Sequence, residues 1–126
     1  MSSDTISYTR IHADSDGTSH FEDIDVTMAS MSYAPPAPPM AVSDPIEADR
    51  FVFVGAATGW VGDWHPSPKR QFVFFLGGVF QVRVGDGETR RFGPGDVLLL
   101  EDTVGQGHFS QVISKESGLM AMVHLE

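Results

Sequence analysis

Along most of this chain, apolar and polar residues alternate with the period of two that is typical of β-strands. A first strand is predicted over residues 19–26, where Phe21 and Ile24 fall on opposite sides. After residue 50, short apolar runs separated by glycine-containing turns predict about eight more strands. They cover residues 50–55, the segment before His65, and residues 71–77, 79–85, 88–93, 96–102, 108–114 and 119–126. No segment has a sustained helical period, so an all-β sandwich or barrel is expected.

A proline-rich segment near residues 32–45 interrupts this pattern and holds five of the eight prolines. Proline lacks the backbone N–H that a sheet interior needs, which argues against a helix or a central strand there. We therefore expect an extended connector on the surface. Residues 85–87, GDG, lie between two alternating runs and predict a tight hairpin, because glycine and aspartate tolerate the positive φ that such turns need.

The length of 126 residues and the hydrophobic content of 41% are typical of one globular domain with a single core. Within it we expect an arm, first strand and proline-rich connector over residues 1–50, and a barrel core over residues 51–126. The chain has no run of about 18 apolar residues, and its start lacks the basic and apolar layout of a secretory signal. Cytoplasmic location is expected, and no membrane association.

Charge and cysteine content exclude several kinds of partner and site. The net charge is −9 with only eight lysines and arginines, whereas nucleic-acid binding depends on many basic side chains, so no nucleic-acid partner is expected. Residues 1–50 hold nine of the acidic side chains, which favours a solvated acidic surface that aids solubility; the alternative is an acidic arm that packs near the more basic middle of the chain. Without cysteine, any metal would be held by imidazole, carboxylate or amide groups.

The stretch over residues 59–112 carries a histidine near each end and glycines at regular spacings. The positions concerned are Gly59, His65, Ser67, Gln71 and Gly78, followed by Gly95 and His108. These spacings resemble the two motifs of the cupin superfamily. Its first motif runs glycine, five residues, histidine, one residue, histidine, three or four residues, glutamate, six residues, glycine, and its second reaches a histidine about a dozen residues after a glycine. The resemblance implies a small single-domain, RmlC-like jelly-roll β-barrel of two antiparallel sheets.

Two of the four metal-ligand positions that the resemblance implies are altered. Ser67 stands where most metal-binding cupins have a second histidine, and Gln71 stands where they have a glutamate. A divalent transition metal remains possible through His65, Gln71 and His108, but an amide is a weak ligand and no carboxylate balances the charge. No cofactor is therefore favoured. Glu101 and Asp102 end a strand near His108, where they are candidates for a loop cap or for a hydrogen-bond partner of His108, and Asp63 is a candidate for forming a turn or for orienting the pocket.

Without a metal, the same three side chains suit acid–base chemistry. An imidazole passes protons near neutral pH, and the Gln71 amide can donate to a developing oxyanion, so His65, Gln71 and His108 are the candidate catalytic residues. Positions 65, 67 and 71 share parity on an extended backbone, so their side chains are expected to point into the barrel. The candidate pocket residues around them are Trp60, Trp64, Ser67, Val73, Phe75, Phe80 and Ser110. Such a lining suits an apolar or aromatic small molecule.

Three functions from different classes remain open, and an enzyme is favoured. The first is a lyase, isomerase or cyclase that works by proton transfer. The second is a metal-dependent cupin enzyme such as a dioxygenase, with a degenerate His/Gln/His site. The third is a barrel that binds a small ligand without catalysis. Alternation places Phe72 and Phe74 on the outer face of their strand, where a partner must cover them, so a homodimer is also expected.

Overall fold

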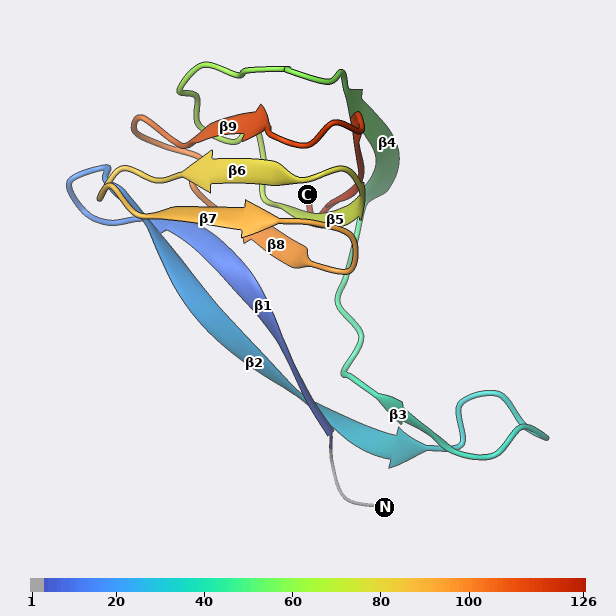
Figure 1. Cartoon of the computed structure of the whole chain (residues 1–126). Helices are drawn as coiled ribbons and strands as arrows, with labels where there is room; N and C mark the ends of the chain where they lie inside the picture. Colours follow the sequence, from blue (N-terminus) through green and yellow to red (C-terminus); the bar gives the residue numbers. More distant parts are fainter. Residues whose placement is uncertain (1–3) are drawn as a thin grey trace.

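The computed structural model describes residues 4–126, which form ten β-strands in two sheets. The strands are β1 (Asp4–Ala13), β2 (Ser19–Met31), β3 (Met40–Val42), β4 (Arg50–Ala56), β5 (Gln71–Gly77), β6 (Phe80–Arg83), β7 (Thr89–Phe92), β8 (Val97–Leu100), β9 (Phe109–Val112) and β10 (Gly118–His124). The larger sheet has the order β3-β2-β1-β8-β5-β10-β4, and the smaller one β7-β6-β9 (Figure 1). The predicted all-β, two-sheet architecture is confirmed. No helix in these residues could span a membrane, and cytoplasmic location stays a prediction.

The strands predicted after residue 50 are present as β4 to β10, with one exception. The segment before His65 forms no strand; it pairs with the chain around β9 through two isolated bridges, Val61 with Gln111 and His65 with His108. Prolines 66 and 68, which have no backbone N–H, follow directly and limit pairing beyond His65. The predicted strand is therefore wrong at this point, and the segment is an irregular wall beside β9.

The amino-terminal strand β1 was not predicted from the sequence. It pairs with β2 over its whole length, from Asp4 opposite Met28 to Ala13 opposite Ser19, and it lies parallel to β8 on its other side. The larger sheet is therefore not purely antiparallel. The short turn between β1 and β2 requires these two strands to be antiparallel. It places no such requirement on β1 and β8, which are far apart in the sequence. Pairing with β1 also extends β2 beyond the predicted end at residue 26.

The hydrophobic core lies between the two sheets. Phe75 of β5 stacks on Phe92 of β7 with ring centroids 5.2 Å apart, and Phe80 of β6 lies 5.5 Å from Phe75. Ile11 of β1 is fully buried in the same cluster. Burying a side chain of this size contributes about 1.5–3 kcal/mol, so β1 is an integral part of the barrel although it belongs to the predicted arm.

The proline-rich connector lies at the far end of the long β1–β2 hairpin, away from the barrel (Figure 1). Its prolines at positions 35, 36, 38 and 39 are exposed. After them, β3 adds to the edge of the sheet by pairing with the end of β2, with Met40 opposite Met31. A short edge strand thus forms where only an extended connector was predicted.

The outer face of the larger sheet is apolar across several neighbouring strands. Strand register places Phe53 of β4 opposite Ala121 of β10, and Ala121 opposite Phe74 of β5. Tyr8 of the β1–β2 hairpin covers part of this face by packing against Phe72. Phe51, Phe53 and Phe74 remain 55%, 68% and 38% exposed, which leaves on the order of 300 Å² of ring surface in water. Patches of this size are typical of interaction surfaces.

We expect the homodimer predicted from the sequence to use this outer face, and a charge at its centre should then disrupt it. Phe53→Glu is expected to convert the dimer to a monomer, because a carboxylate would be buried against apolar rings. Sedimentation velocity measures the change. Val104→Glu, at a residue equally exposed but on the loop after β8, is the matched control and should leave the dimer intact. A wild-type chain that is monomeric at all concentrations would contradict this expectation.

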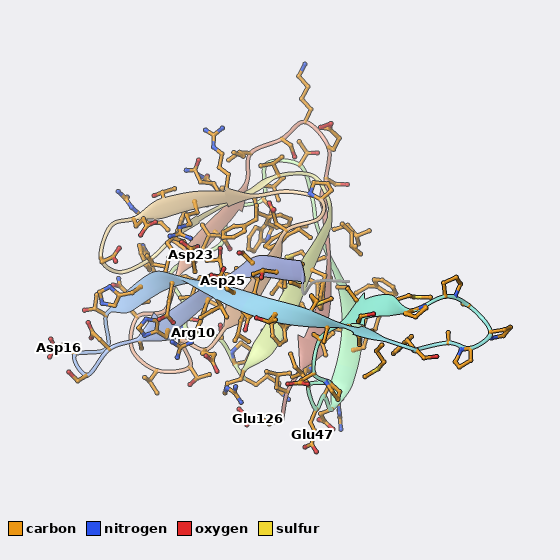
Figure 2. All side chains as sticks on the ribbon, turned by 90° about the horizontal axis from the view of Figure 1, so that it is seen from below. Arg10, Asp16, Asp23, Asp25, Glu47 and Glu126 are labelled. Carbon is orange, nitrogen blue, oxygen red and sulfur yellow. The ribbon has the colours of Figure 1, made fainter. Side chains whose placement is uncertain are left out.

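Charged side chains tie the acidic hairpin to the barrel. In Figure 2 the side chains of Asp16, Asp23 and Asp25 follow the β1–β2 hairpin. Arg90 of β7 donates a 2.6 Å hydrogen bond to Asp23, a contact between the acidic arm and the basic middle of the chain, which was the less favoured alternative to a solvated acidic surface. His20 on β2 bridges two turns, 2.7 Å from Asp14 and 2.9 Å from Asp86. Exposed pairs of this kind add little stability individually.

The His20 bridge predicts a defined pH dependence of stability. Hydrogen bonds to Asp14 and Asp86 favour the imidazolium and raise the pKa of His20. The bridge therefore stabilises the fold below the unfolded-state pKa of about 6.5, and this contribution is lost as the pH rises through the raised folded-state value. It is also lost in acid, when the pH falls through the folded-state pKa values of Asp14 and Asp86 and both carboxylates are protonated. Hydrogen bonds hold these two pKa values below their usual range.

Urea unfolding of the wild type and of His20→Gln at a series of pH values tests this dependence. The difference in unfolding free energy is expected to be largest between about pH 4 and pH 6.5 and to shrink above that range. A difference that grows with rising pH would contradict the assignment. An NMR titration of the His20 ring measures the direction of the pKa shift separately, with His12, whose ring centroid lies 5.9 Å away, followed in the same spectra.

Candidate functional site

A cavity of about 380 Å³ lies inside the barrel, between the larger sheet and the small one. Its floor comes from alternate residues of β5, β8 and β10, because every second side chain of a strand points to the same face. Its rim comes from the irregular segment around His65 and from the start of β9. The cavity is lined by Val54, Gly55, Ala56, Trp60, His65, Ser67, Pro68, Gln71, Val73, Phe75, Phe80, Val82, Leu98, Leu100, His108, Ser110, Met120 and Met122.

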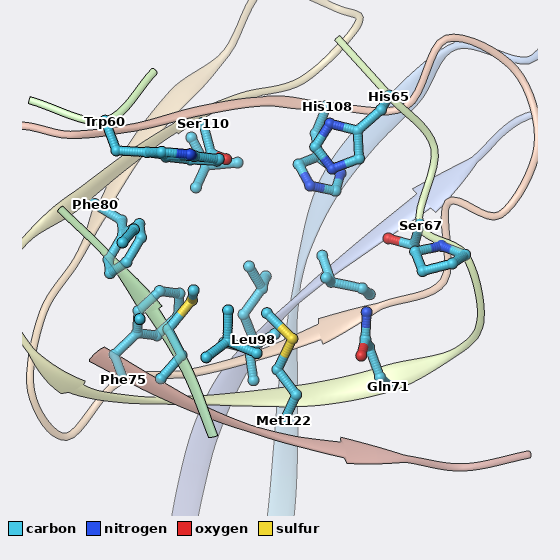
Figure 3. A pocket seen from close by; sticks show the side chains of 18 residues that line it. Trp60, His65, Ser67, Gln71, Phe75, Phe80, Leu98, His108, Ser110 and Met122 are labelled. Carbon is cyan, nitrogen blue, oxygen red and sulfur yellow. The ribbon is translucent and has the colours of Figure 1, made fainter. Parts of the chain in front are cut away.

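The two histidines meet at one end of this cavity (Figure 3). Their backbones form a two-way bridge, with the amide of each donating to the carbonyl of the other at 3.1 Å. The imidazole ring centroids are 4.9 Å apart. Gly107 makes this approach possible: it adopts φ +78°, and a Cβ there would lie 1.9 Å from the carbonyl oxygen of His65. A side chain at position 107 would push the histidine-bearing segment away from β9.

His108 is held by a buried carboxylate. Its Nδ1 lies 2.7 Å from Oδ2 of Asp102, and the hydroxyl of Ser67 donates to Oδ1 of the same group at 2.9 Å. Asp102 is fully buried and His108 is 6% exposed. A carboxylate only accepts hydrogen bonds, so Nδ1 of His108 carries the proton. The candidate partnership between Asp102 and His108 is thus present in the structure, and Ser67 completes it.

His65 is fixed through the same ring nitrogen. Its Nδ1 lies 2.7 Å from the backbone carbonyl oxygen of Asp63, and a carbonyl also only accepts. In both rings Nδ1 is therefore a donor to the protein, and Nε2 is the nitrogen left for a ligand. Within residues 4–126, Nδ1 of His124 is the only side-chain nitrogen or oxygen that is both buried and without a hydrogen-bond partner. Nε2 of His108 is not in that condition, so it remains accessible from the cavity. Both histidines thus present an open Nε2 atom to the cavity.

Gln71, the first residue of β5, lies across the cavity from the two imidazoles (Figure 3). It is buried, and it lines the cavity. Val73 and Phe75 follow at alternate positions and line the same cavity, while Phe72 and Phe74 face the other side of the sheet. The inward and outward directions predicted for β5 are thus present. An amide directed at a cavity can donate to an oxygen atom of a ligand.

The structure brings most of the predicted pocket residues together. Trp60, Ser67, Val73, Phe75, Phe80 and Ser110 line the cavity. Trp64 does not, because its ring packs against Phe109 on the outside of the small sheet, with centroids 6.1 Å apart. Sequence reasoning missed Val54, Leu98, Met120 and Met122. Their alternate spacing within strands is the signal, but only strand pairing shows which alternate positions face the cavity.

Glu101, the neighbour of Asp102, points away from the cavity. It accepts hydrogen bonds from Arg10 and from Arg70, the latter at 2.6 Å. Burial raises the pKa of Glu101, but these hydrogen bonds outweigh burial and hold it below its usual range. Successive residues of an extended chain point to opposite sides. Asp102 therefore orients His108 on one side, and Glu101 binds Arg10 of β1 on the other.

The donor set does not fit a tightly held metal. Within residues 4–126 there is no group of three histidine, cysteine, aspartate or glutamate side chains that could hold a metal ion. His65 and His108 supply two imidazoles and Gln71 a neutral amide, while both oxygens of Asp102 already accept hydrogen bonds. Transition-metal sites in proteins have at least three stronger ligands as a rule. His65, Gln71 and His108 are therefore considered through their own acid–base and hydrogen-bonding chemistry.

Comparisons with known proteins identify the fold. No protein-family model matches the sequence, and no curated protein matches it. Among solved structures, the Cnp3 cupin domain of Schizosaccharomyces pombe aligns with a TM-score of 0.50 and 14% identity, over 100% of this chain and 86% of the other. An RmlC-like cupin from Shewanella frigidimarina gives 0.46 and 18%, over 94% and 85%. At such identities the likeness concerns the fold alone, which does not fix a reaction. The chain therefore has a jelly-roll fold like that of the Cnp3 cupin domain, the fold that its motif spacing predicted.

Proposed function

We propose that this protein is a small-molecule enzyme that works by proton transfer, with His65 and His108 as base and acid and Gln71 as the group that polarises the substrate. The proposal covers those lyase, isomerase and cyclase reactions that begin with removal of a proton next to an activating group. The observation that carries it is the matched anchoring of both imidazoles. Each donates Nδ1–H to an oxygen that only accepts, which leaves both Nε2 atoms for chemistry.

The proposed first step removes a proton from a carbon next to a carbonyl group. Nε2 of one histidine takes this proton, and the Gln71 amide donates a hydrogen bond to the carbonyl oxygen as negative charge develops on it. Asp102 stabilises the imidazolium when His108 is the acceptor, since its carboxylate lies 2.7 Å from Nδ1. That imidazolium passes the proton to Nε2 of the second, neutral imidazole, which then delivers it to another atom of the substrate. Ring centroids only 4.9 Å apart let both act on one small molecule.

Exchange of carbon-bound protons in D₂O is the direct test. The protein is treated with chelator and incubated with small carbonyl compounds such as acetophenone, and loss of the α-proton signal is followed by NMR. The proposal predicts exchange that persists after chelation and stops when both histidines are replaced by alanine. Exchange that disappears with chelation would support a metal-dependent cupin enzyme. Binding without exchange across a broad panel would support a barrel that binds without catalysis.

A further inference from the structure

The lining of the cavity contains no aspartate, glutamate, lysine or arginine within the described residues. Asp102, whose carboxylate contacts His108 of the lining, is fully buried, and its two oxygens accept hydrogen bonds from His108 and Ser67. This absence is unusual for the chain, since charged residues make up 20% of the sequence. A ligand with a permanent charge would lose its hydration in this cavity and meet no fixed charge of opposite sign.

Polar and apolar groups are also separated within the cavity. His65, Ser67, Gln71 and His108 gather at one end, while Trp60, Phe75 and Phe80 lie toward the other (Figure 3). Met122 and Leu98 lie between the two ends. Hydrogen-bonding side chains are therefore concentrated around one end of a bound molecule, and its other end contacts mainly rings and aliphatic side chains.

We infer that the ligand of this cavity is an uncharged molecule with one apolar, ring-sized end and one oxygen-bearing polar end. This inference rests on the proposed function in one respect: histidines that serve as bases are neutral when the substrate binds, so they do not offset a substrate carboxylate or phosphate. The cavity volume of about 380 Å³ lies near the lower limit of ligand pockets. It suits one ring or a short chain.

The cost of burying charge separates this class from charged metabolites. An ionised carboxylate or ammonium group moved into an apolar site costs far more than a carbonyl or hydroxyl that finds one hydrogen bond. The Gln71 amide and the two open Nε2 atoms supply such hydrogen bonds to a carbonyl or hydroxyl oxygen. Of the side chains at the apolar end, Trp60 through its indole N–H and Ser110 through its hydroxyl are the ones that could hydrogen-bond a second polar group.

Three probes of nearly equal shape test the inference: acetophenone, benzoate and benzylammonium. Their binding is measured by NMR titration at about pH 8, where an ordinary imidazole is uncharged. Acetophenone is expected to bind at least about tenfold more tightly than either ion, a factor that corresponds to 1.4 kcal/mol. Benzoate or benzylammonium binding as tightly as acetophenone would overturn the inference. Failure of all three to bind at millimolar concentration would also overturn it.

The two tryptophans provide a matched pair of variants. Trp60→Ala is expected to weaken acetophenone binding roughly fivefold or more, because it removes an aromatic wall of the cavity. Trp64→Ala removes the same side chain outside the cavity and should leave the affinity unchanged. The proposed function fails separately: selective binding of acetophenone without exchange of its methyl protons would contradict proton transfer while leaving the ligand class in place.

Discussion

His65→Ala and His108→Ala are each expected to lower proton-transfer turnover by about 10²-fold to 10⁴-fold, the range that a positioned acid or base contributes. The reason is geometric, since each residue supplies one of the two open Nε2 atoms at the polar end of the cavity. His65 is exposed, so His65→Ala should still fold, whereas His108→Ala removes a hydrogen-bond partner from the buried Asp102 and its folding is checked by urea unfolding. The measurement is the rate of α-proton exchange at saturating acetophenone.

His12→Ala is the matched control for both variants. It removes an imidazole from β1, outside the cavity lining, and should leave the exchange rate unchanged. The double variant is expected to lose little more than the more damaged single variant, because residues that act as one unit are not additive. Full activity in both single variants would contradict the assignment of the histidines as acid and base.

Asp102→Ala is expected to lower turnover by about 10²-fold to 10⁴-fold although Asp102 touches no ligand. Without the carboxylate, Nδ1 of His108 loses its acceptor and the ring is free to carry its proton on Nε2, where it is no longer a base. The change also leaves Ser67 Oγ and His108 Nδ1 buried without their partner, at a cost of about 1–3 kcal/mol each. Exchange kinetics and urea unfolding measure the two effects.

Asp102→Asn separates the role of orientation from that of charge. The asparagine oxygen can accept from His108 while its amide donates to the Ser67 hydroxyl, which can also act as an acceptor. The Nδ1–H form of His108 is therefore expected to survive in this variant, and turnover should fall less than in Asp102→Ala. Equal loss in both variants would show that the negative charge, not the orientation of the ring, is what proton transfer requires.

Motif spacing and strand alternation predicted much of the site. The spacing from Gly59 to Gly78 placed His65 and Gln71 correctly at the cavity, because turn glycines and ligand-facing residues recur at fixed positions in this fold. Alternation on β5 separated the inward Val73 and Phe75 from the outward Phe72 and Phe74. Both signals depend on local backbone geometry, which the sequence reports directly.

Long-range pairing could not be predicted in the same way. Ile11 is the one residue of β1 that is fully buried in the core, so the alternation of apolar and polar residues along β1 is weak. The parallel pairing of β1 with β8 has no signal in the sequence of either strand. The division of labour between Glu101 and Asp102 depends on where Arg10 and Ser67 lie after folding. Trp64 lies outside the cavity, as its place next to the inward His65 requires, whereas Trp60 has the same parity and still lines the cavity because the chain before His65 is irregular.

The most direct test of the account is the tautomeric state of the two cavity histidines. Long-range ¹H–¹⁵N correlation spectra of the metal-free protein, at a pH where the rings are neutral, show which ring nitrogen carries the proton. The account predicts the Nδ1–H form for both His65 and His108, with Nε2 unprotonated and open to the cavity. A neutral ring with its proton on Nε2 in either residue would contradict the account, because that nitrogen could not then accept a proton from a ligand.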